Sequence, residues 1–192
     1  MKASSSSYPT KFGSEAGSLA GLVLRPIQPA DVAQLVTLCA EHAAFEQAPF
    51  TENGQAERLA GFLFGPRPAA YCLVVARDQE LLGFATYMPE FSTWDAAYYL
   101  HLDCLFLRPE LRGRGLGRRV MTAIAYEAQR LGCALVQWQT PEFNRNAIAF
   151  YRRLGAREKA KLRFYLDPYQ PIGAHLPPEA GELQRTGNSA PG

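Results

Sequence analysis

The sequence has 192 residues, of which 47% are hydrophobic and 20% are charged, a composition typical of one soluble globular domain. The formal net charge is +2 and no basic stripe with interleaved aromatic residues is present, which argues against a nucleic-acid partner because such proteins need a concentrated cationic surface. No apolar stretch near the N-terminus is long enough for a signal peptide or a membrane span, so we expect no membrane partner and a cytoplasmic location.

The ends of the chain differ in composition from its middle. Residues 1–20 are rich in Ser and Gly and carry no periodic apolar pattern, which predicts a flexible leader. Residues 169–192 contain many Pro and Gly residues, which predict a loosely packed tail. The expected folded domain is therefore residues 21–168.

The four cysteines carry no sign of a cross-linked or metal-bound scaffold. They lie in apolar runs and form no Cys-x-x-Cys pair. A domain of this size buries enough surface to fold without disulfides or a structural metal. We therefore expect reduced core thiols, and no metal site, at Cys39, Cys72, Cys104 and Cys133.

The first part of the domain predicts one strand, two helices and a hairpin. Residues 22–27 form an apolar β-prone run, and Pro29 suits the first turn of a helix that continues to Glu46 with apolar residues at helical spacing. A second, shorter helix is expected at residues 56–64. The segments 70–78 and 80–88 are apolar and meet at a polar turn, which is typical of an antiparallel hairpin.

The second part alternates strands with helices. Residues 98–107 predict a strand, and residues 116–132 an amphipathic helix that ends at a glycine. Residues 134–140 predict a buried strand, residues 144–155 a short helix, and residues 157–167 one or two final strands. This order indicates an α/β (α+β) fold in which helices cover a mixed sheet.

A glycine-rich loop from Arg112 to Gly117 joins the strand 98–107 to the following helix. Its sequence fits the pattern Arg/Gln-x-x-Gly-x-Gly/Ala. Small residues let backbone N–H groups approach a phosphate, and the start of the helix adds unpaired N–H groups and partial positive charge. A plain connection with solvated arginines is the alternative. Neither a complete Gly-x-Gly-x-x-Gly motif nor the Gly-Lys-Ser/Thr of a P-loop is present, so the common nucleotide motifs do not apply.

From about Leu22 to Asp167 the sequence resembles the GNAT superfamily of acetyltransferases, and within it the spermidine/spermine (diamine) acetyltransferase group. The resemblance implies a mixed, mostly antiparallel sheet of six to seven strands with about four helices, acetyl-CoA as co-substrate, and a homodimer. The stretches that carry it occur in the same order: LRPIQPADVAQLVTLCAEHAAFE, AYCLVVARD, GFATYMPEFSTWDAAYYLHLDCLFLRPELRGRGLG and FNRNAIAFYRRLGA.

The resemblance also implies which residues bind acetyl-CoA. Backbone groups near the end of the strand 98–107 would bond to the pantetheine arm, and the loop would hold the pyrophosphate. The implied cofactor-binding residues are Leu105, Phe106, Leu107, Arg112, Gly113, Arg114, Gly115, Leu116, Gly117, Arg118, Asn144 and Asn146.

Two residues are candidates for the chemistry of transfer. A protonated amine must lose a proton before it attacks a thioester, and Asp103, where the diamine group carries a glutamate, is the candidate base. Asp103 has the alternative role of capping a bulge in its strand, and His101 on the same strand face is the reserve base. Tyr151 matches the general acid of the family, and its phenol suits protonation of a thiolate. The alternative for Tyr151 is a packing tyrosine.

The acceptor is less well defined. Phe45 and Glu46 match an aromatic-acid pair that contacts amine in the diamine group, Trp94 matches an aromatic of the same site, and Glu142 is a further anionic candidate. Ser92 stands where that group carries an aspartate. We expect direct acetylation of a small cationic amine in a ternary complex. Amino acids, aminoglycosides, a protein amine, and a non-catalytic acyl-CoA-binding regulatory domain remain alternatives.

Overall fold

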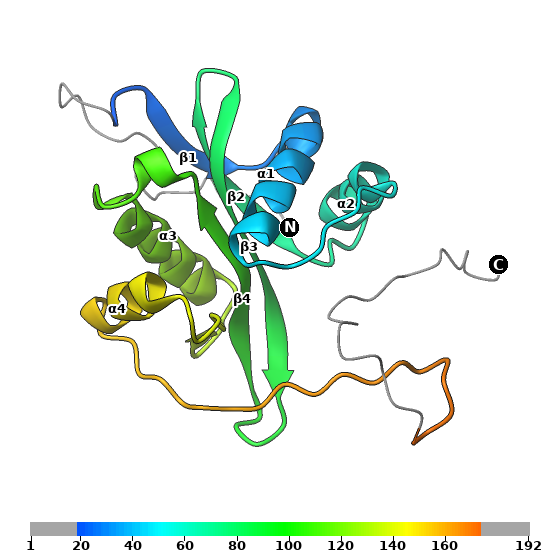
Figure 1. Cartoon of the computed structure of the whole chain (residues 1–192). Helices are drawn as coiled ribbons and strands as arrows, with labels where there is room; N and C mark the ends of the chain where they lie inside the picture. The colour runs from blue at the N-terminus through cyan, green and yellow to red at the C-terminus, as the bar shows by residue number, and fades with distance from the viewer. Residues whose placement is uncertain (1–18, 174–192) are drawn as a thin grey trace.

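The computed structural model describes residues 19–173 and has a central sheet flanked by helices (Figure 1). The predicted leader therefore lies outside the described residues up to residue 18, as does the predicted tail from residue 174. The strands are β1 (Leu22–Pro26), β2 (Tyr71–Arg77), β3 (Glu80–Ser92), β4 (Ala97–Leu107) and β5 (Val136–Gln137). The helices are α1 (Val32–Phe45), α2 (Gln55–Phe64), α3 (Leu116–Arg130) and α4 (Arg145–Arg153), with single 3-10 turns η1 (Pro29–Asp31) and η2 (Pro109–Leu111).

The sheet runs in the order β1-β2-β3-β4-β5. Its first four strands are antiparallel neighbours, and β5 is parallel to β4. Helix α3 lies against one face, and α1 lies against the other with α2 beside it (Figure 1). Both faces are thus covered, which is why β2 is an uninterrupted apolar run. Along β2, Leu73 and Val75 belong to the core under α3, whereas Cys72 and Val74 belong to the core under α1.

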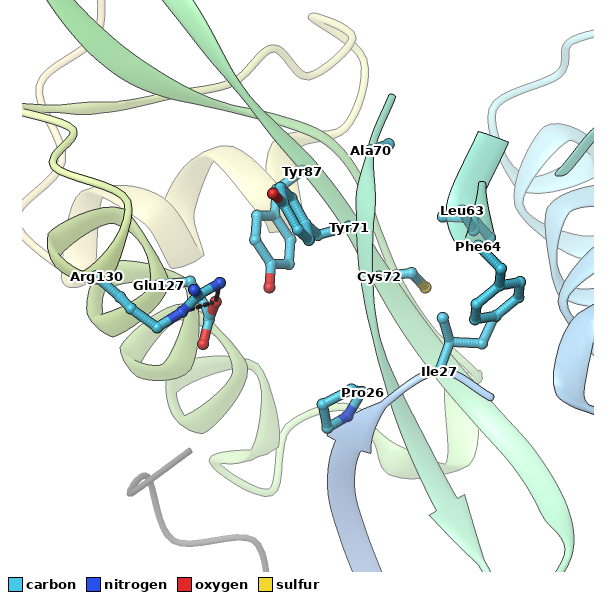
Figure 2. Close-up of a pocket in the computed structure, with 10 residues that line it drawn as sticks. All are labelled: Pro26, Ile27, Leu63, Phe64, Ala70, Tyr71, Cys72, Tyr87, Glu127 and Arg130. Atoms are coloured by element: carbon cyan, nitrogen blue, oxygen red, sulfur yellow. Dashed lines mark hydrogen bonds and ion pairs between the residues drawn. The ribbon is translucent and has the colours of Figure 1, made fainter. Parts of the chain in front are cut away.

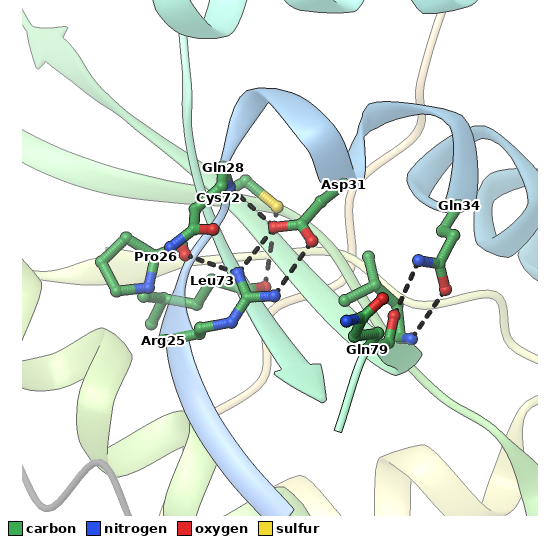
Figure 3. Close-up of polar contacts among 9 residues, drawn as sticks. Arg25, Pro26, Gln28, Asp31, Gln34, Cys72, Leu73 and Gln79 are labelled. Atoms are coloured by element: carbon green, nitrogen blue, oxygen red, sulfur yellow. Dashed lines mark hydrogen bonds and ion pairs between the residues drawn. The ribbon is translucent and has the colours of Figure 1, made fainter. Parts of the chain in front are cut away.

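The junction between β1 and α1 is held by a partly buried ion pair (Figure 3). Asp31, which is 6% exposed, accepts hydrogen bonds from the Arg25 guanidinium at 2.6 and 2.9 Å. It also accepts a bond from the backbone N–H of Gln28 at 2.8 Å. The bonds from Arg25, supported by that from Gln28, lower the pKa of Asp31. This pair fixes the direction in which α1 leaves the sheet.

We expect Asp31→Asn to lower the free energy of unfolding by about 2 kcal/mol at neutral pH, because it leaves the Arg25 charge without its partner. The pKa of Asp31 is lowered in the folded state, so its contribution is present above the ordinary aspartate pKa of about 3.9 and is lost as pH falls through the lowered folded value. Urea unfolding of both proteins along a pH series measures this. Asp78→Asn, in an exposed turn with φ of 53°, is the matched control. Equal loss in the two variants would contradict the prediction.

The last predicted strand is wrong: residues 157–167 form no strand, and within residues 19–173 the sheet has five strands instead of six to seven. The segment runs away from the sheet (Figure 1), with Leu162 and Phe164 exposed by 84% and 86%. The predicted strand 134–140 is reduced to the two residues of β5, and Leu135 is 53% exposed. So short a strand offers little edge for a further strand to pair with, which is why the apolar pattern of residues 157–167 is not realised here.

Candidate active site

Strands β4 and β5 pair over two residues and then separate. Along β4, only Leu100 and His101 have partners in β5. Beyond them β4 continues to its end with β3 on one side and, within residues 19–173, no strand on the other. Main-chain groups on that edge are therefore open to a ligand that extends the sheet. The residues predicted to contact the pantetheine arm lie on this stretch: Leu105, Phe106 and Leu107.

The glycine-rich loop follows this open edge and leads into α3. Gly113 and Gly115 have φ angles of +73° and +79°, in the left-handed region that favours glycine. A Cβ at either position would meet no atom within 4 Å, so the space beside the loop is open. Gly115 is the N-cap of α3 and offers no side chain to the first N–H groups of the helix. These N–H groups, with buried Leu116 anchoring the turn beneath them, fit the pyrophosphate of the predicted co-substrate.

The third glycine of the loop has a different role. A Cβ on Gly117 would lie 3.0 Å from Cζ of Phe150, so the missing side chain lets α4 approach the first turn of α3. Phe150 precedes Tyr151, and the close contact therefore helps to place the predicted acid. The loop motif combines open space at Gly113 and Gly115 with a packing contact at Gly117, and the sequence pattern does not distinguish the two.

Arg112 turns back toward the sheet. Its Nε donates a hydrogen bond to the carbonyl oxygen of Leu107 at 2.8 Å. Its guanidinium lies 4.4 Å from the ring centroid of Phe45 and 5.5 Å from that of Phe106. Burial lowers the pKa of Arg112. Arg112 thus ties the loop to the end of α1, while Arg114 and Arg118 are exposed around the loop.

Tyr151 lies half-buried on α4 and faces an aromatic partner that the sequence reading missed. Its ring centroid is 4.9 Å from that of Trp138, in the segment after β5, and 5.1 Å from that of Phe150. Burial, together with the negative charge of Glu46, raises the pKa of Tyr151 to about 12. Its phenol therefore stays protonated at neutral pH. Both roles considered for Tyr151 are compatible with this geometry, because its ring packs against two aromatic rings and its phenol stays protonated.

Asp103 is placed by an irregularity in β4. The pairing of β3 with β4 shifts at this point, because Thr86 faces Cys104 and Tyr87 faces Leu102, so Asp103 is the extra residue of a β-bulge. Its carboxylate is exposed and accepts a hydrogen bond from Thr86 Oγ1 at 3.4 Å. The same carboxylate oxygen also accepts a contact from Cys104 Sγ at 3.6 Å. A bulge changes the direction of the side chain it carries. Asp103 can therefore form the bulge and also act as the predicted base.

The end of α1 adds a histidine that the sequence reading did not single out. His42 Nε2 lies 3.4 Å from Oε1 of Glu46, one helical turn later. The His42 ring stacks on Phe106, with ring centroids 5.3 Å apart. Glu46 in turn is close enough to raise the pKa of Tyr151. The i,i+4 spacing of His42 and Glu46 was the available signal. The structure brings α1, β4 and α4 together around Glu46.

Other predicted residues are not brought to this cluster. Trp94 is 96% exposed at the tip of the β3–β4 hairpin. Along β4 the tip is six residues from Asp103, or about 20 Å at the rise of a strand. Near the tip, Ser92 donates a hydrogen bond to Asp95 at 2.6 Å. Glu142 is exposed in the turn before α4.

The polar residues at the start of α4 have local roles. Asn144 is the N-cap of α4, and its side-chain oxygen accepts a bond from the backbone N–H of Ala147 at 3.2 Å. Asn146 is exposed in the first helical turn. Asn144 therefore fixes the start of the helix that carries Tyr151, whatever contact it makes with the co-substrate. His101, the reserve base, lies where β4 still pairs with β5, two residues from Asp103.

A separate cavity of about 240 Å³ lies where β1 ends beside the start of β2 (Figure 2). Stacked Tyr71 and Tyr87 form one wall, and the ion pair of Glu127 with Arg130, at 2.7 Å, lies on α3. Ile27 and other apolar residues complete the lining. None of the predicted site residues lines this cavity.

Residues 19–173 contain neither a metal-binding cluster nor a membrane-spanning helix. In this range no group of three or more His, Cys, Asp or Glu side chains is arranged to hold a metal ion. No helix in the same range has the length and apolar character needed to cross a bilayer. All four cysteines are free thiols, as predicted, although only Cys72 is fully buried.

Comparison with known proteins identifies the family. The model of the acetyltransferase (GNAT) family matches residues 33–156. The thialysine N-epsilon-acetyltransferase of Sus scrofa is 25% identical over 148 residues, which cover 73% of this chain and 86% of that protein. The L-ornithine N5-acetyltransferase of Arabidopsis thaliana is 32% identical over 80 residues, 42% of this chain and 35% of that protein.

A solved structure agrees with the fold. An aminoglycoside acetyltransferase from an uncultured soil metagenomic sample, in complex with trehalose, superimposes with a TM-score of 0.66 at 18% identity, covering 77% of this chain and 96% of that one. The predicted fold class is thereby confirmed, apart from the number of strands. The split between β4 and β5, the open loop before α3 and the family match lead to one conclusion: the chain belongs to the acetyltransferase (GNAT) family and is an N-acetyltransferase that uses acetyl-CoA as its acetyl donor.

Proposed function

We propose that the protein acetylates a primary amine of a small cationic acceptor, of the diamine or polyamine type, by direct attack within a ternary complex. The observation that supports this most is the position of Glu46, whose negative charge acts on the predicted acid Tyr151. The carboxylate of Asp103 lies close enough to His42, the neighbour of Glu46, to act on its pKa. An anionic surface beside the proton donor suits a positively charged acceptor.

The co-substrate would lie along the open edge of β4, with its pyrophosphate at the loop. Main-chain groups of Leu105 to Leu107 would hold the pantetheine arm, and the N–H groups at Gly113, Gly115 and the start of α3 would hold the phosphates. Acetyl-CoA supplies the thioester carbonyl that the amine attacks. The residues of this chain bind it, orient it and move protons.

Three proton transfers complete the proposed reaction. Asp103, directly or through a water molecule, accepts a proton from the ammonium group, which leaves a neutral amine with a lone pair for attack. A C–N bond forms, the attacking nitrogen loses its second proton to solvent, and the C–S bond breaks with the electron pair staying on sulfur. Tyr151 then donates its phenolic proton to the thiolate and regains one from solvent. The result is an acetylated amine and free CoA, with no acyl-enzyme.

Thiol release from acetyl-CoA with a panel of amines tests the proposal. The panel contains diamines, amino acids, aminoglycosides and a lysine-containing peptide. Turnover with diamines is the expected result. Absence of thiol release with every amine, together with tight CoA binding, would overturn it in favour of a regulatory domain that binds acyl-CoA without turnover.

Pairs of acceptors that differ only in an α-carboxylate test whether the site favours a purely cationic amine. The names of the relatives place the acetyl group on a side-chain nitrogen, N-epsilon of thialysine or N5 of ornithine. The carboxylates of Glu46 and Asp103 would repel the α-carboxylate of such amino acids. We therefore propose that 1,4-diaminobutane is used with a higher kcat/KM than ornithine, and 1,5-diaminopentane with a higher kcat/KM than lysine. A preference for the amino acid in both pairs would overturn the diamine assignment and leave acetyl transfer itself intact.

We also propose that the protein is a homodimer in which the hairpin tip of one copy serves the other. Trp94 is too far along the hairpin to reach the Asp103 of its own chain, and Phe91 and Tyr98 near the tip are 54% and 53% exposed. An exposed aromatic group of this kind is typical of an interaction surface. This would allow Trp94 to line an acceptor site as the sequence predicts.

Complementation checks this arrangement. Trp94→Ala and Tyr151→Phe are each expected to be impaired alone. Mixing the two by unfolding and refolding together should recover about a quarter of wild-type activity, because half of the random dimers are mixed and each of these has one complete site of two. Mixing without subunit exchange is the control. Activity no higher than the mean of the single variants would contradict a role for Trp94 across the dimer.

A further inference from the structure

His42 is a titratable side chain at the centre of the active site with no part in the transfer steps above. Its side chain is 15% exposed, whereas that of Glu46, 3.4 Å away, is 36% exposed. The imidazole is clamped between rings, stacked on Phe106 at 5.3 Å and edge-on to Phe84 at 6.0 Å. His42 is thus fixed in the protein interior, and Glu46 extends from it toward solvent and Tyr151.

Charged groups face His42 from three elements. Glu46 lies on its own helix, Asp103 faces it from β4, and Arg112 faces it from the loop before α3. Burial lowers the pKa of His42, the two carboxylates oppose this shift, and Arg112 adds to it. The imidazole is therefore neutral at neutral pH, and its Nε2–H can donate to Glu46. With His42 neutral, the two carboxylates and the single guanidinium give a net charge of one negative unit around it. A proton added to His42 cancels this charge.

We propose that His42 is a positioning residue that holds the Glu46 carboxylate toward the acceptor amine, and that protonation of His42 removes the anionic character of the acceptor site. This inference rests on the proposed function, because it concerns how a cationic acceptor is bound. Its consequence is an acceptor site that weakens as pH falls, while acetyl-CoA binding at the loop is unaffected. We therefore expect a change in KM for the amine and no change in kcat.

Steady-state kinetics with 1,4-diaminobutane between pH 5.5 and 8.5 test the inference, since both of its amines stay protonated over most of this range. In the wild type, KM for the amine should rise toward the acid end, by less than the roughly tenfold that an imidazole of ordinary pKa would give, because the pKa of His42 is lowered. His42→Leu keeps an apolar side chain against Phe106 but loses the N–H, so KM should be about tenfold higher already at pH 8 and change little with pH. His42→Gln keeps an N–H donor and cannot become a cation. Its KM at pH 8 should lie below that of His42→Leu and stay flat as pH falls.

A double-mutant cycle separates positioning from general disruption. If His42 acts through Glu46, His42→Leu should raise KM in the wild type and have no further effect in a Glu46→Gln background. Thermal unfolding and acetyl-CoA binding of each variant serve as controls for folding. Equal effects of His42→Leu in both backgrounds, or an acid rise in KM of His42→Gln as steep as that of the wild type, would overturn the inference.

An NMR titration of the His42 ring protons tests the contact between His42 and Glu46 without any enzyme turnover. Because the Glu46 carboxylate raises the pKa of His42, Glu46→Gln should lower that pKa further. An unchanged His42 titration would overturn the inference even if no amine is acetylated. If no amine releases thiol but the titration shifts, the proposed function fails and the contact between the two side chains stands. The two failures are thereby distinguishable.

Discussion

Tyr151→Phe is expected to lower kcat by about 100-fold or more while acetyl-CoA affinity stays within about threefold. The substitution removes one oxygen atom and keeps the ring that packs against Trp138 and Phe150. An alkyl thiolate is a poor leaving group without a proton, and Tyr151 is the residue that the fold holds as a protonated phenol. Stopped-flow and steady-state thiol release measure kcat, and titration calorimetry measures acetyl-CoA binding.

The pH profile gives this prediction a second readout. Because burial and Glu46 raise the pKa of Tyr151 to about 12, the phenol keeps its proton well above the ordinary tyrosine pKa of about 10. We therefore expect no loss of kcat from Tyr151 ionisation up to about pH 10. Trp138→Phe, which keeps an aromatic ring beside Tyr151, is the matched control for altered packing. A Tyr151→Phe enzyme with wild-type turnover would remove Tyr151 from the mechanism.

Asp103→Asn is expected to lower kcat/KM for the amine by about 100-fold at neutral pH, because the amide cannot accept the proton of the ammonium group. The substitution keeps the size of the side chain at the β-bulge, where its contact with Thr86 is long and weak at 3.4 Å. Stability should therefore change by less than about 1 kcal/mol. Thiol release and urea unfolding of the same preparations separate the catalytic effect from the structural one.

Two further variants identify the base. Asp103→Glu restores a carboxylate on a side chain one methylene longer. Its kcat/KM for the amine should be at least about tenfold higher than that of Asp103→Asn. If the defect of Asp103→Asn reflects a missing base, activity should rise with pH as free amine becomes available in solution. His101→Gln tests the reserve base, and a loss as large as that of Asp103→Asn would transfer the role to His101. A parallel fall in stability and activity for Asp103→Asn would instead reduce Asp103 to the residue that shapes the bulge.

Several parts of this molecule could be read from local pattern. Helical spacing predicted α1 and α3, and Gly132, at a φ of +71°, follows the end of α3 as expected of a C-terminal glycine. The hairpin of β2 and β3 was marked by two apolar runs around a polar turn. The loop from Arg112 to Gly117 was recognisable because its chemistry depends on residues adjacent in the chain. Such features need only neighbours within a few positions.

Local pattern was insufficient where a residue depends on distant parts of the chain. Residues 157–167 have the alternation of a strand, but a strand also needs an edge with which to pair, and β5 provides two residues. Trp94 resembles an acceptor residue in sequence, yet the length of the hairpin places it far from Asp103 in its own chain. Local sequence carries no information about the length of a neighbouring strand.

From the sequence alone, the resemblance along residues 22–167 indicated the family and the co-substrate. The loop at the start of α3 was recognisable because its physical basis is local. Only the tertiary structure decided that Gly117 serves the packing of Phe150, that Arg112 lies over Phe45, and that Glu46 links His42 to Tyr151. These relations join α1, the loop before α3, α3 and α4, and that between α1 and α4 spans more than a hundred positions of the chain. Charge and burial act through space, so the proposed anionic acceptor site could be inferred only once the fold placed these side chains together.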